Sequence, residues 1–273
     1  MGVLRAIGIA FLALLAVLLL LGFVGYLYYV NQLNQPKPVL AMNWPAGLYY
    51  KGPDTTALAG WYCIENISSS NGYSIQLNAQ LNNGEWRAQD VYMVAPGEVG
   101  FGENVWPCGW EGCHPVSLKF VETGPASCAW LVIALKNGTA YIGYSLDGKS
   151  ITWFEEYPVP ANYITATIPG TPASGFTGIV LAGYGNGAQA QLGSGTLVYL
   201  ALYYWNGTTW VPAPVGPSQG FQTGETVNHA WEFASGYCGG YVAWFGWNKT
   251  NWESPVLPSN LEPVCPSPPS FEP

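Results

Sequence analysis

Few of the side chains that most often carry catalysis occur in this chain of 273 residues. The only histidines are His114 and His229, and the aspartates are Asp54, Asp90 and Asp147. None of these aspartates lies in an Asp-Thr-Gly or Asp-Ser-Gly loop, which argues against a two-aspartate peptidase. The His-Glu-x-x-His helix of zinc peptidases is also absent. If an acid does chemistry here, we therefore expect it to be a glutamate.

Two adjacent glutamates could supply such an acid. Glu155 and Glu156 lie in SITWFEEYPV, a predicted strand. Neighbouring side chains on a strand point to opposite faces, so one of the two could enter a cleft.

A long apolar segment at the N-terminus predicts that the chain leaves the cytoplasm. Residues 6–30 contain no charged side chain, and their centre reads FLALLAVLLLLGFVG. This is about the 20 apolar residues that cross a bilayer core as a helix. Arg5 precedes the segment and keeps the N-terminus in the cytoplasm. We predict that residues 1–30 form a membrane anchor with an extracellular C-terminal domain; if the segment is instead a cleaved signal, the domain is secreted.

Cysteines and glycosylation sequons fit an extracellular domain. An even number of cysteines in an oxidising compartment predicts three disulfides, but the sequence does not choose among the pairings. The six cysteines are Cys63, Cys108, Cys113, Cys128, Cys238 and Cys265. Cys108 and Cys113, followed by His114, could alternatively hold a metal with a distant partner, but we expect neither metal nor cofactor. Asn-x-Ser/Thr sequons occur at Asn66, Asn137, Asn206 and Asn248.

The charge balance excludes a nucleic-acid partner. The formal net charge is −8, and there is no basic cluster to contact phosphates. Charged residues make up only 9% of the chain, against about 25% in an average soluble domain. A fold that depends on few ionised carboxylates loses little when they are protonated, so the composition is compatible with acid conditions.

Turn signals and alternating patterns predict an all-β fold, an antiparallel β-sandwich, after the N-terminal helix. Hairpins are expected over residues 72–94, 129–146 and 195–214, with turns at Asn82-Asn83-Gly84, Asn137-Gly138 and Asn206-Gly207. We expect a stalk over residues 31–58, the sandwich over residues 59–253, and an extended proline-rich tail over residues 254–273, tethered through Cys265.

Three stretches, in this order, resemble the thermopsin family, acid-active extracellular peptidases of archaea. They are SIQLNAQLNNGEWRAQDVYMV (74–94), WFEEYPVPANYITATIPGTPASGFTGIVLAGYGNG (153–187) and LYYWNGTTWVPAPVGPSQGFQTGETVNHAWEF (202–233). The resemblance implies a β-sandwich related to glutamic peptidases and a polypeptide substrate. Carried over residue by residue, the resemblance implies that Glu225 and Gln89 are the catalytic pair. Gln222, three positions before that glutamate, stands where the family has an acidic residue, and the region Cys108–Cys128 has no counterpart in the family.

Such a pair has a simple chemical logic. A carboxylate takes a proton from water and makes it nucleophilic towards a peptide carbonyl. A neutral amide beside it donates to the developing oxyanion. The alternative is a non-catalytic surface protein, such as an envelope component, adhesin or glycan binder, or a pilus-like subunit. In that case Gln89 is an ordinary outward strand residue and Glu225 caps a turn.

Overall fold

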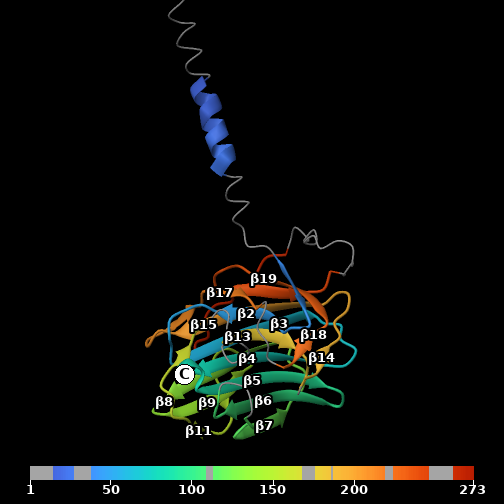
Figure 1. Ribbon diagram of the computed structural model, residues 1–273, viewed down its shortest axis with the longest axis vertical. Coiled ribbons are helices and arrows are strands. Elements are labelled where there is room, and N and C mark those ends of the chain that lie inside the picture. Colours follow the sequence, from blue (N-terminus) through green and yellow to red (C-terminus); the bar gives the residue numbers. More distant parts are fainter. Residues whose placement is uncertain are drawn as a thin grey trace, which may run out of the picture. The chain divides into compact units, whose positions relative to one another are not determined.

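The computed structural model describes residues 15–27, 38–108, 113–167, 176–185, 187–218, 224–245 and 261–273. The chain divides into two units, residues 1–37 and residues 38–273. Almost all regular structure in the second unit is antiparallel β-sheet, as Figure 1 shows. The all-β prediction is therefore confirmed.

The larger sheet has ten strands. They are β1 (Val39–Met42), β3 (Ala57–Asn66), β8 (Cys128–Lys136), β9 (Thr139–Ser145), β10 (Thr152–Trp153), β11 (Tyr157–Pro158), β15 (Leu197–Trp205), β16 (Trp210–Pro212), β19 (His229–Ala234) and β20 (Gly239–Ala243). Their order is β1-β19-β20-β15-β3-β8-β9-β10, with β11 beside β9 and β16 beside β15.

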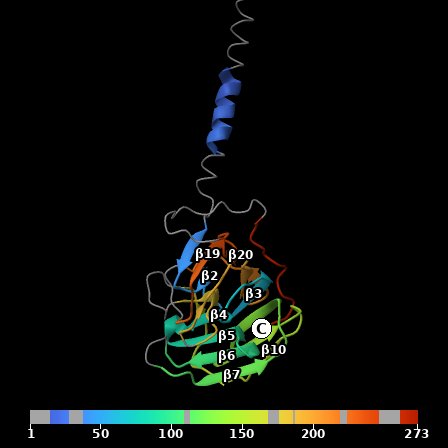
Figure 2. The ribbon, with the colours of Figure 1, turned by 90° about the vertical axis from the view of Figure 1, so that its right-hand side faces the viewer.

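The smaller sheet has eight strands and carries the polar face described below. They are β2 (Ala46–Tyr50), β4 (Tyr73–Leu81), β5 (Trp86–Ala95), β6 (Glu98–Trp106), β7 (Ser117–Glu122), β12 (Ile164–Thr165), β13 (Gly178–Ala182) and β17 (Val215–Pro217). Their order is β17-β2-β13-β4-β5-β6-β7, with β12 beside β4. Figure 2 shows β4, β5, β6 and β7 as successive bands in this order.

Two small elements complete the fold. A single 3₁₀ turn, η1 (Asn82–Gly84), joins β4 to β5. The strands β14 (Gln189–Ala190) and β18 (Thr226–Val227) form a separate parallel pair.

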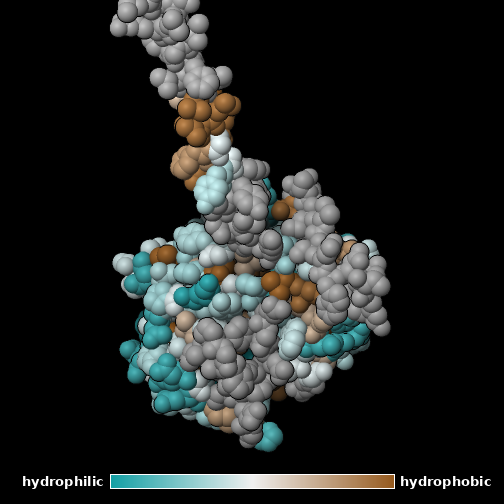
Figure 3. Space-filling view, turned by 45° about the horizontal axis from the view of Figure 1, so that its top comes forward, coloured by the Kyte–Doolittle hydropathy of each residue, from teal (hydrophilic) through white to brown (hydrophobic). Residues whose placement is uncertain are grey.

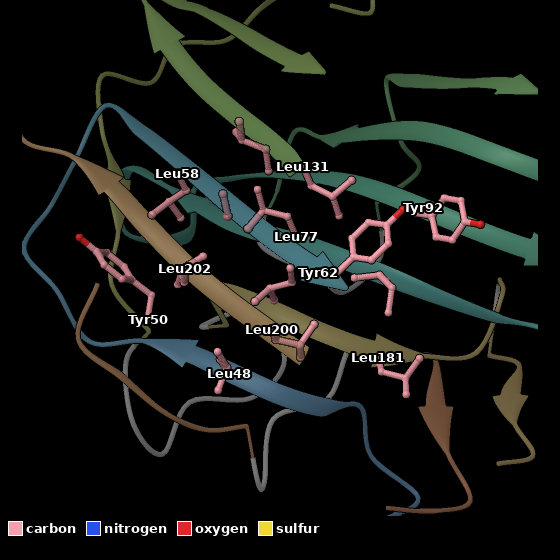
Figure 4. Packing of buried hydrophobic residues seen from close by; sticks show 14 of the residues in the cluster. Leu48, Tyr50, Leu58, Tyr62, Leu77, Tyr92, Leu131, Leu181, Leu200 and Leu202 are labelled. Atoms are coloured by element: carbon pink, nitrogen blue, oxygen red, sulfur yellow. The ribbon is translucent and has the colours of Figure 1, made fainter. Parts of the chain in front are cut away.

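The core lies between the two large sheets. Along β4, Ile75, Leu77 and Ala79 point inward and are fully buried. They belong to one apolar cluster with leucines and tyrosines of the opposite sheet, including Leu131 and Leu200, as Figure 4 shows. Burying one such side chain contributes roughly 1.5–3 kcal/mol, so this cluster holds the two sheets together. The predicted β-sandwich is confirmed.

The predicted hairpins are present. β4 pairs with β5, β8 with β9 and β15 with β16, each in antiparallel register. At the β8–β9 turn, Asn137 and Gly138 have φ of 52° and 72°, the left-handed conformation of a two-residue type I′ turn.

The predicted stalk is wrong for residues 39–50. These residues form β1, which pairs with β19, and β2, which pairs with β13 and β17. Two of the prolines that suggested a stalk, Pro38 and Pro45, directly precede β1 and β2 and lie inside neither strand. Proline is tolerated there because it removes no interior ladder hydrogen bond.

The helical residues of the first unit are 15–27, and their large apolar side chains are exposed. In Figure 3 they are drawn mostly in the brown of hydrophobic residues. In the part of the chain that the structure describes, none of the helices has both the length and the apolar character needed to cross a bilayer. The predicted span, residues 6–30, extends beyond this helix at both ends, into residues outside the described ranges.

All six cysteines are paired: Cys63 with Cys128, Cys108 with Cys113, and Cys238 with Cys265. The prediction of three disulfides is confirmed. The first links directly opposed residues of β3 and β8. The Cys108–Cys113 disulfide leaves neither sulfur as a free thiolate for a metal. Of the sequons, Asn66, Asn137 and Asn206 are exposed, and Asn248 lies outside the described residues.

The C-terminal residues 261–273 form no helix or strand and are tethered by the Cys238–Cys265 disulfide. They make further contacts that the sequence did not predict. The Phe271 ring packs edge-on against Trp130 and Trp210 on the outer face of the larger sheet. The backbone N–H of Ser270 donates to the Gly148 carbonyl at 2.8 Å.

Candidate active site

The outward faces of β4 and β5 are polar but shielded from water. Along β4 the polar residues alternate with the inward apolar ones, as expected for a half-buried strand. Such outward side chains are normally solvated, but here each is at most 6% exposed. The buried polar residues of this face are Ser74, Gln76, Asn78, Gln80, Arg87 and Gln89.

A cavity of about 350 Å³ opens beside this polar face. One part of its wall is polar and comes from Gln76 on β4, Gln89 on β5, Asn104 on β6 and Glu225. Another part is apolar, formed by Val91, Met93, Trp106, Leu118 and Phe120. A space with an apolar wall and a few convergent polar groups is the usual form of a ligand site.

Glu225 and Gln89, the two residues that the resemblance indicates, therefore line the same cavity. They are distant in sequence and come from different parts of the fold. The rival glutamates do not line it: Glu155 and Glu156 are exposed, and Glu155 forms an ion pair with Lys119. Gln222 lies outside the described residues.

Glu225 immediately precedes β18, so the parallel pairing of β14 and β18 positions it. Thr226 N–H donates to the Ala188 carbonyl at 3.1 Å, and Asn228 N–H to the Ala190 carbonyl at 3.0 Å. Gly224, just before it, has a φ of 89°, a conformation that favours glycine. The carboxylate is thereby directed towards β4 and β5.

The pKa of Glu225 is raised above its ordinary value of 4.5, because burial disfavours the charged form. Four interactions oppose that effect. The positive charge of Arg87 lowers the pKa, and so do hydrogen bonds from the residue's own backbone N–H, the Gln76 side chain and the Gly187 N–H. The result is a shielded carboxyl group that the chain can still ionise.

Gln76 connects Gln89 to Glu225. Its Nε2 donates to Gln76 Oε1 at 3.0 Å and to Asn78 Oδ1 at 2.9 Å. Its Oε1 accepts from Asn104 Nδ2 at 3.2 Å. Both hydrogens of the Gln89 amide are thus engaged, and Gln76 is the amide in contact with the carboxylate.

Arg87 is the cation that acts on Glu225, and it is 1% exposed. Its Nη2 donates to Asn78 Oδ1 at 2.5 Å, and its guanidinium carbon lies 5.1 Å from the centre of the Trp106 ring. Burial lowers the pKa of Arg87 to about 9, against the opposing effect of Glu225. The side chain therefore stays cationic at neutral and acid pH.

Neither a family model nor a curated protein matches this chain. Among solved structures, it is similar to a functionally unknown protein from Saccharomyces cerevisiae. That match has 12% identity and a TM-score of 0.31, over 54% of this chain and 83% of the other. It is also similar to a chain in the crystal structure of a mouse coronavirus receptor-binding domain complexed with its murine receptor. There the identity is 10% and the TM-score 0.27, over 49% and 74%. At such scores the function has to be inferred from the cavity itself.

The sequence analysis did not single out Gln76, Asn78 or Arg87. A signal for the first two was present, because Gln76, Asn78 and Gln80 recur with the period of a strand and so share one face. The role of Arg87 could be recognised only from the strand register, which places it opposite Gln80 on β4 and Trp106 on β6.

One further motif proves to be structural. Residues 216–220, GPSQG, fit the Gly-x-Ser-x-Gly pattern of serine hydrolases. Ser218 is fully buried, and its Oγ donates to Glu232 Oε2 at 2.7 Å or to the Pro45 carbonyl at 2.9 Å. A nucleophilic serine needs an exposed oxygen, so this serine serves the fold.

Among the described residues, no group of three or more histidines, cysteines and acids is arranged to hold a metal ion.

Proposed function

We propose that this chain is an acid endopeptidase of the thermopsin-like type, in which Glu225 activates a water molecule for attack on a peptide bond. One observation carries the proposal. A shielded carboxyl group, held by four stabilising interactions, lines the same cavity as three side-chain amides. The ordered resemblance of residues 74–94, 153–187 and 202–233 to the thermopsin family supports the same reaction.

The reaction needs no group beyond these residues and water. The Glu225 carboxylate accepts a proton from water while the water oxygen bonds to the peptide carbonyl carbon. The carbonyl oxygen becomes an oxyanion and is stabilised by amide N–H donors. The protonated Glu225 then gives its proton to the leaving nitrogen as the C–N bond breaks.

The oxyanion donors are the amides of Gln89 and Asn104. Gln89 can donate to a substrate oxygen only by releasing Gln76 or Asn78, because both its hydrogens are engaged. Asn104 uses one Nδ2 hydrogen on Gln89, and an amide nitrogen carries two. Its second N–H is therefore the donor that costs the resting chain least.

The raised pKa of Glu225 defines the acid limb of activity. A general base must be ionised, so the rate falls as the pH drops through a pKa that lies above 4.5. We expect activity in mildly acidic solution and little in strong acid.

The test is cleavage of denatured casein by the full chain between pH 3 and 7, comparing wild type with Glu225→Gln and Glu156→Gln. Loss of a general base costs about 10²–10⁴ in rate, so Glu225→Gln should lose at least a hundredfold. Glu156 is exposed and does not line the cavity, so Glu156→Gln should match wild type. Wild-type cleavage by Glu225→Gln, or no cleavage by any form at any pH, would refute the proposal.

We also propose that the reaction takes place outside the cell, with residues 6–30 as the membrane anchor. Three disulfides and three exposed sequons in the described residues support an oxidising, extracytoplasmic location.

A further inference from the structure

A continuous chain of side-chain hydrogen bonds connects Arg87 to Glu225. Arg87 Nη2 donates to Asn78 Oδ1, which also accepts from Gln89 Nε2. The second hydrogen of Gln89 Nε2 goes to Gln76 Oε1. Gln76 then donates to Ser74 Oγ at 2.9 Å and to the carboxylate of Glu225.

An amide can rotate so that its oxygen and nitrogen exchange places, and each can then serve the opposite role. A chain built only of amides therefore has no fixed direction. An arginine removes this freedom, because a guanidinium can only donate. Arg87 forces the oxygen of Asn78 to face it, and each following amide is then set in turn. At the other end, Ser74 Oγ gives its hydrogen to the Gly183 carbonyl and accepts from Gln76 Nε2, which favours the same direction.

The direction of the hydrogen-bond chain decides whether the nitrogen or the oxygen of the Gln76 amide faces Glu225. With Asn78 Oδ1 held by Arg87, the nitrogen of Gln89 must face Asn78, and its other hydrogen selects the oxygen of Gln76. The nitrogen of Gln76 is then left to face Glu225. In the reversed chain, the oxygen of Gln76 would face the carboxylate and repel it.

We propose that Arg87 is a positioning residue that sets the direction of the Asn78–Gln89–Gln76 chain, so that Gln76 presents an N–H to Glu225. This inference deepens the proposed function, but the arrangement it describes exists whether or not the chain cleaves peptides. Arg87 also acts on Glu225 through its charge, and the test has to separate the two effects. Besides Glu225, the charged residues that line the cavity are Glu98 and Lys119, and Lys119 is paired with Glu155.

The variants separate direction from charge. Arg87→Met removes the donor and the charge, whereas Arg87→Lys keeps both. Asn78→Leu breaks the chain and leaves the charge of Arg87 in place. Asn78→Asp keeps a group that can only accept, and therefore keeps the direction.

Gln80→Leu is the matched control. Gln80 is a buried amide on the same face of β4, opposite Arg87, and its side chain has no hydrogen-bond partner among the described residues. It lies outside the chain and does not line the cavity.

The first measurement is the titration of the Glu225 carboxyl by carbon-13 NMR, assigned with Glu225→Gln, in the full chain. We expect Arg87→Met and Asn78→Leu both to raise the midpoint, by about one pH unit or more for Arg87→Met. Arg87→Lys and Gln80→Leu should leave it within a few tenths of wild type. Asn78→Asp should keep the Gln76 side-chain amide signals of the wild type, which Asn78→Leu should lose.

The second measurement is the pH profile of kcat/KM, whose acid limb should move with the titration midpoint while KM changes little. A chain with no peptidase activity would refute the proposed function but leave the titration readable. An unchanged midpoint and unchanged Gln76 signals in folded Asn78→Leu would overturn the role of the chain even if the enzyme is active. If Arg87→Met does not fold, the comparison of Asn78→Leu with Gln80→Leu still decides.

Discussion

Glu225 and Asp90 are two shielded carboxyl groups whose pKa burial raises, but their neighbours differ. Glu225 has Arg87 and several N–H donors, which partly offset the cost of burial. Asp90 is fully buried, and its Oδ2 accepts from Val132 N–H at 2.9 Å. It stands directly opposite another acid, Glu103 on β6. The first arrangement suits a group that must ionise, and the second suits a group that keeps its proton.

The interior acids should make the fold more stable in acid than at neutral pH. Burial raises the pKa of Asp90 well above its ordinary value, and burial also raises that of Glu103 against the opposing effects of Ser117 and Lys119. A carboxyl group whose pKa is higher in the folded chain contributes stability below its unfolded pKa and loses it as the pH rises through the folded one.

We therefore expect Asp90→Asn to raise the midpoint of thermal unfolding at pH 7 and to change it little at pH 3. Thermal melts of wild type and variant across this range provide the measurement. Asp147 behaves oppositely, because N–H donors from Ser150 and Lys149 lower its pKa to about 2, so its contribution is lost as the pH falls from its ordinary pKa of 3.8 through that value. Equal melting of wild type and Asp90→Asn at pH 7 would contradict the prediction.

At the scale of single residues, the sequence could indicate the amide and the acid but not their connection. Gln89 and Glu225 were predicted from motifs, and the structure brings both to one cavity. Arg87 gave no such signal, because its importance depends on which residue of β4 it faces. That information resides in strand register, which a pattern within one strand does not contain.

At the scale of elements, the short parallel pair of β14 and β18 positions Glu225, the proposed general base. β14 and β18 contain two residues each, and their pairing holds Glu225 against the polar face of β4 and β5. Gly187, two residues before β14, has a φ of 76° and directs its N–H at the Glu225 carboxylate. The glycine conformation is thus part of the site.

Gly187→Ala should raise the pKa of Glu225 and move the acid limb of activity to higher pH. A Cβ at this position would meet no atom within 4 Å, so the effect comes from the backbone, where a positive φ costs about 1–2 kcal/mol. The residue relieves that cost by turning its N–H away from the carboxylate.

Gly236→Ala is the matched control, since Gly236 has a φ of 86° and equally open surroundings. It should cost similar stability in a thermal melt without moving the acid limb. A Gly187→Ala enzyme with the pH profile of Gly236→Ala would show that the Gly187 N–H is dispensable.

The hairpins were predictable because each combines alternating strands with an Asn-Gly or Asn-Asn-Gly turn, and these signals are local. The region 150–159, expected as one strand, forms only the short β10 and β11, separated by exposed Glu155 and Glu156. β18 was not predictable at all, because two residues carry no period. Their pairing with β14 depends on tertiary contacts.

At the scale of the whole molecule, the C-terminal segment covers part of the outer face of the larger sheet. Phe271 is 6% exposed and shares a cluster with Trp130 and Trp210. Trp210 Nε1 donates to the Phe271 carbonyl at 2.8 Å, and Tyr203 Oη donates to the Pro266 carbonyl. The disulfide at Cys265 limits how far this segment can move away from the sheet.

Phe271→Ala should destabilise the fold by about 3–5 kcal/mol, as expected for removing a buried phenylalanine. Val264→Ala in the same segment is the control, because Val264 is 38% exposed and should cost much less. Denaturant unfolding of both variants measures the difference. Similar midpoints would show that the segment adds little to the stability of the sheet it covers.

The outer faces of the two sheets therefore differ: the C-terminal segment packs on the larger sheet, and the cavity with Glu225 lies beside the smaller one. On the outer face of the larger sheet, the C-terminal segment occupies the apolar surface around Trp130 and Trp210. On the outer face of the eight-stranded sheet, the cavity remains open, and Glu225 lines it. In the proposed peptidase, an extended substrate would therefore lie along the smaller sheet, and the orientation of the domain at the cell surface would decide which polypeptides reach the cavity.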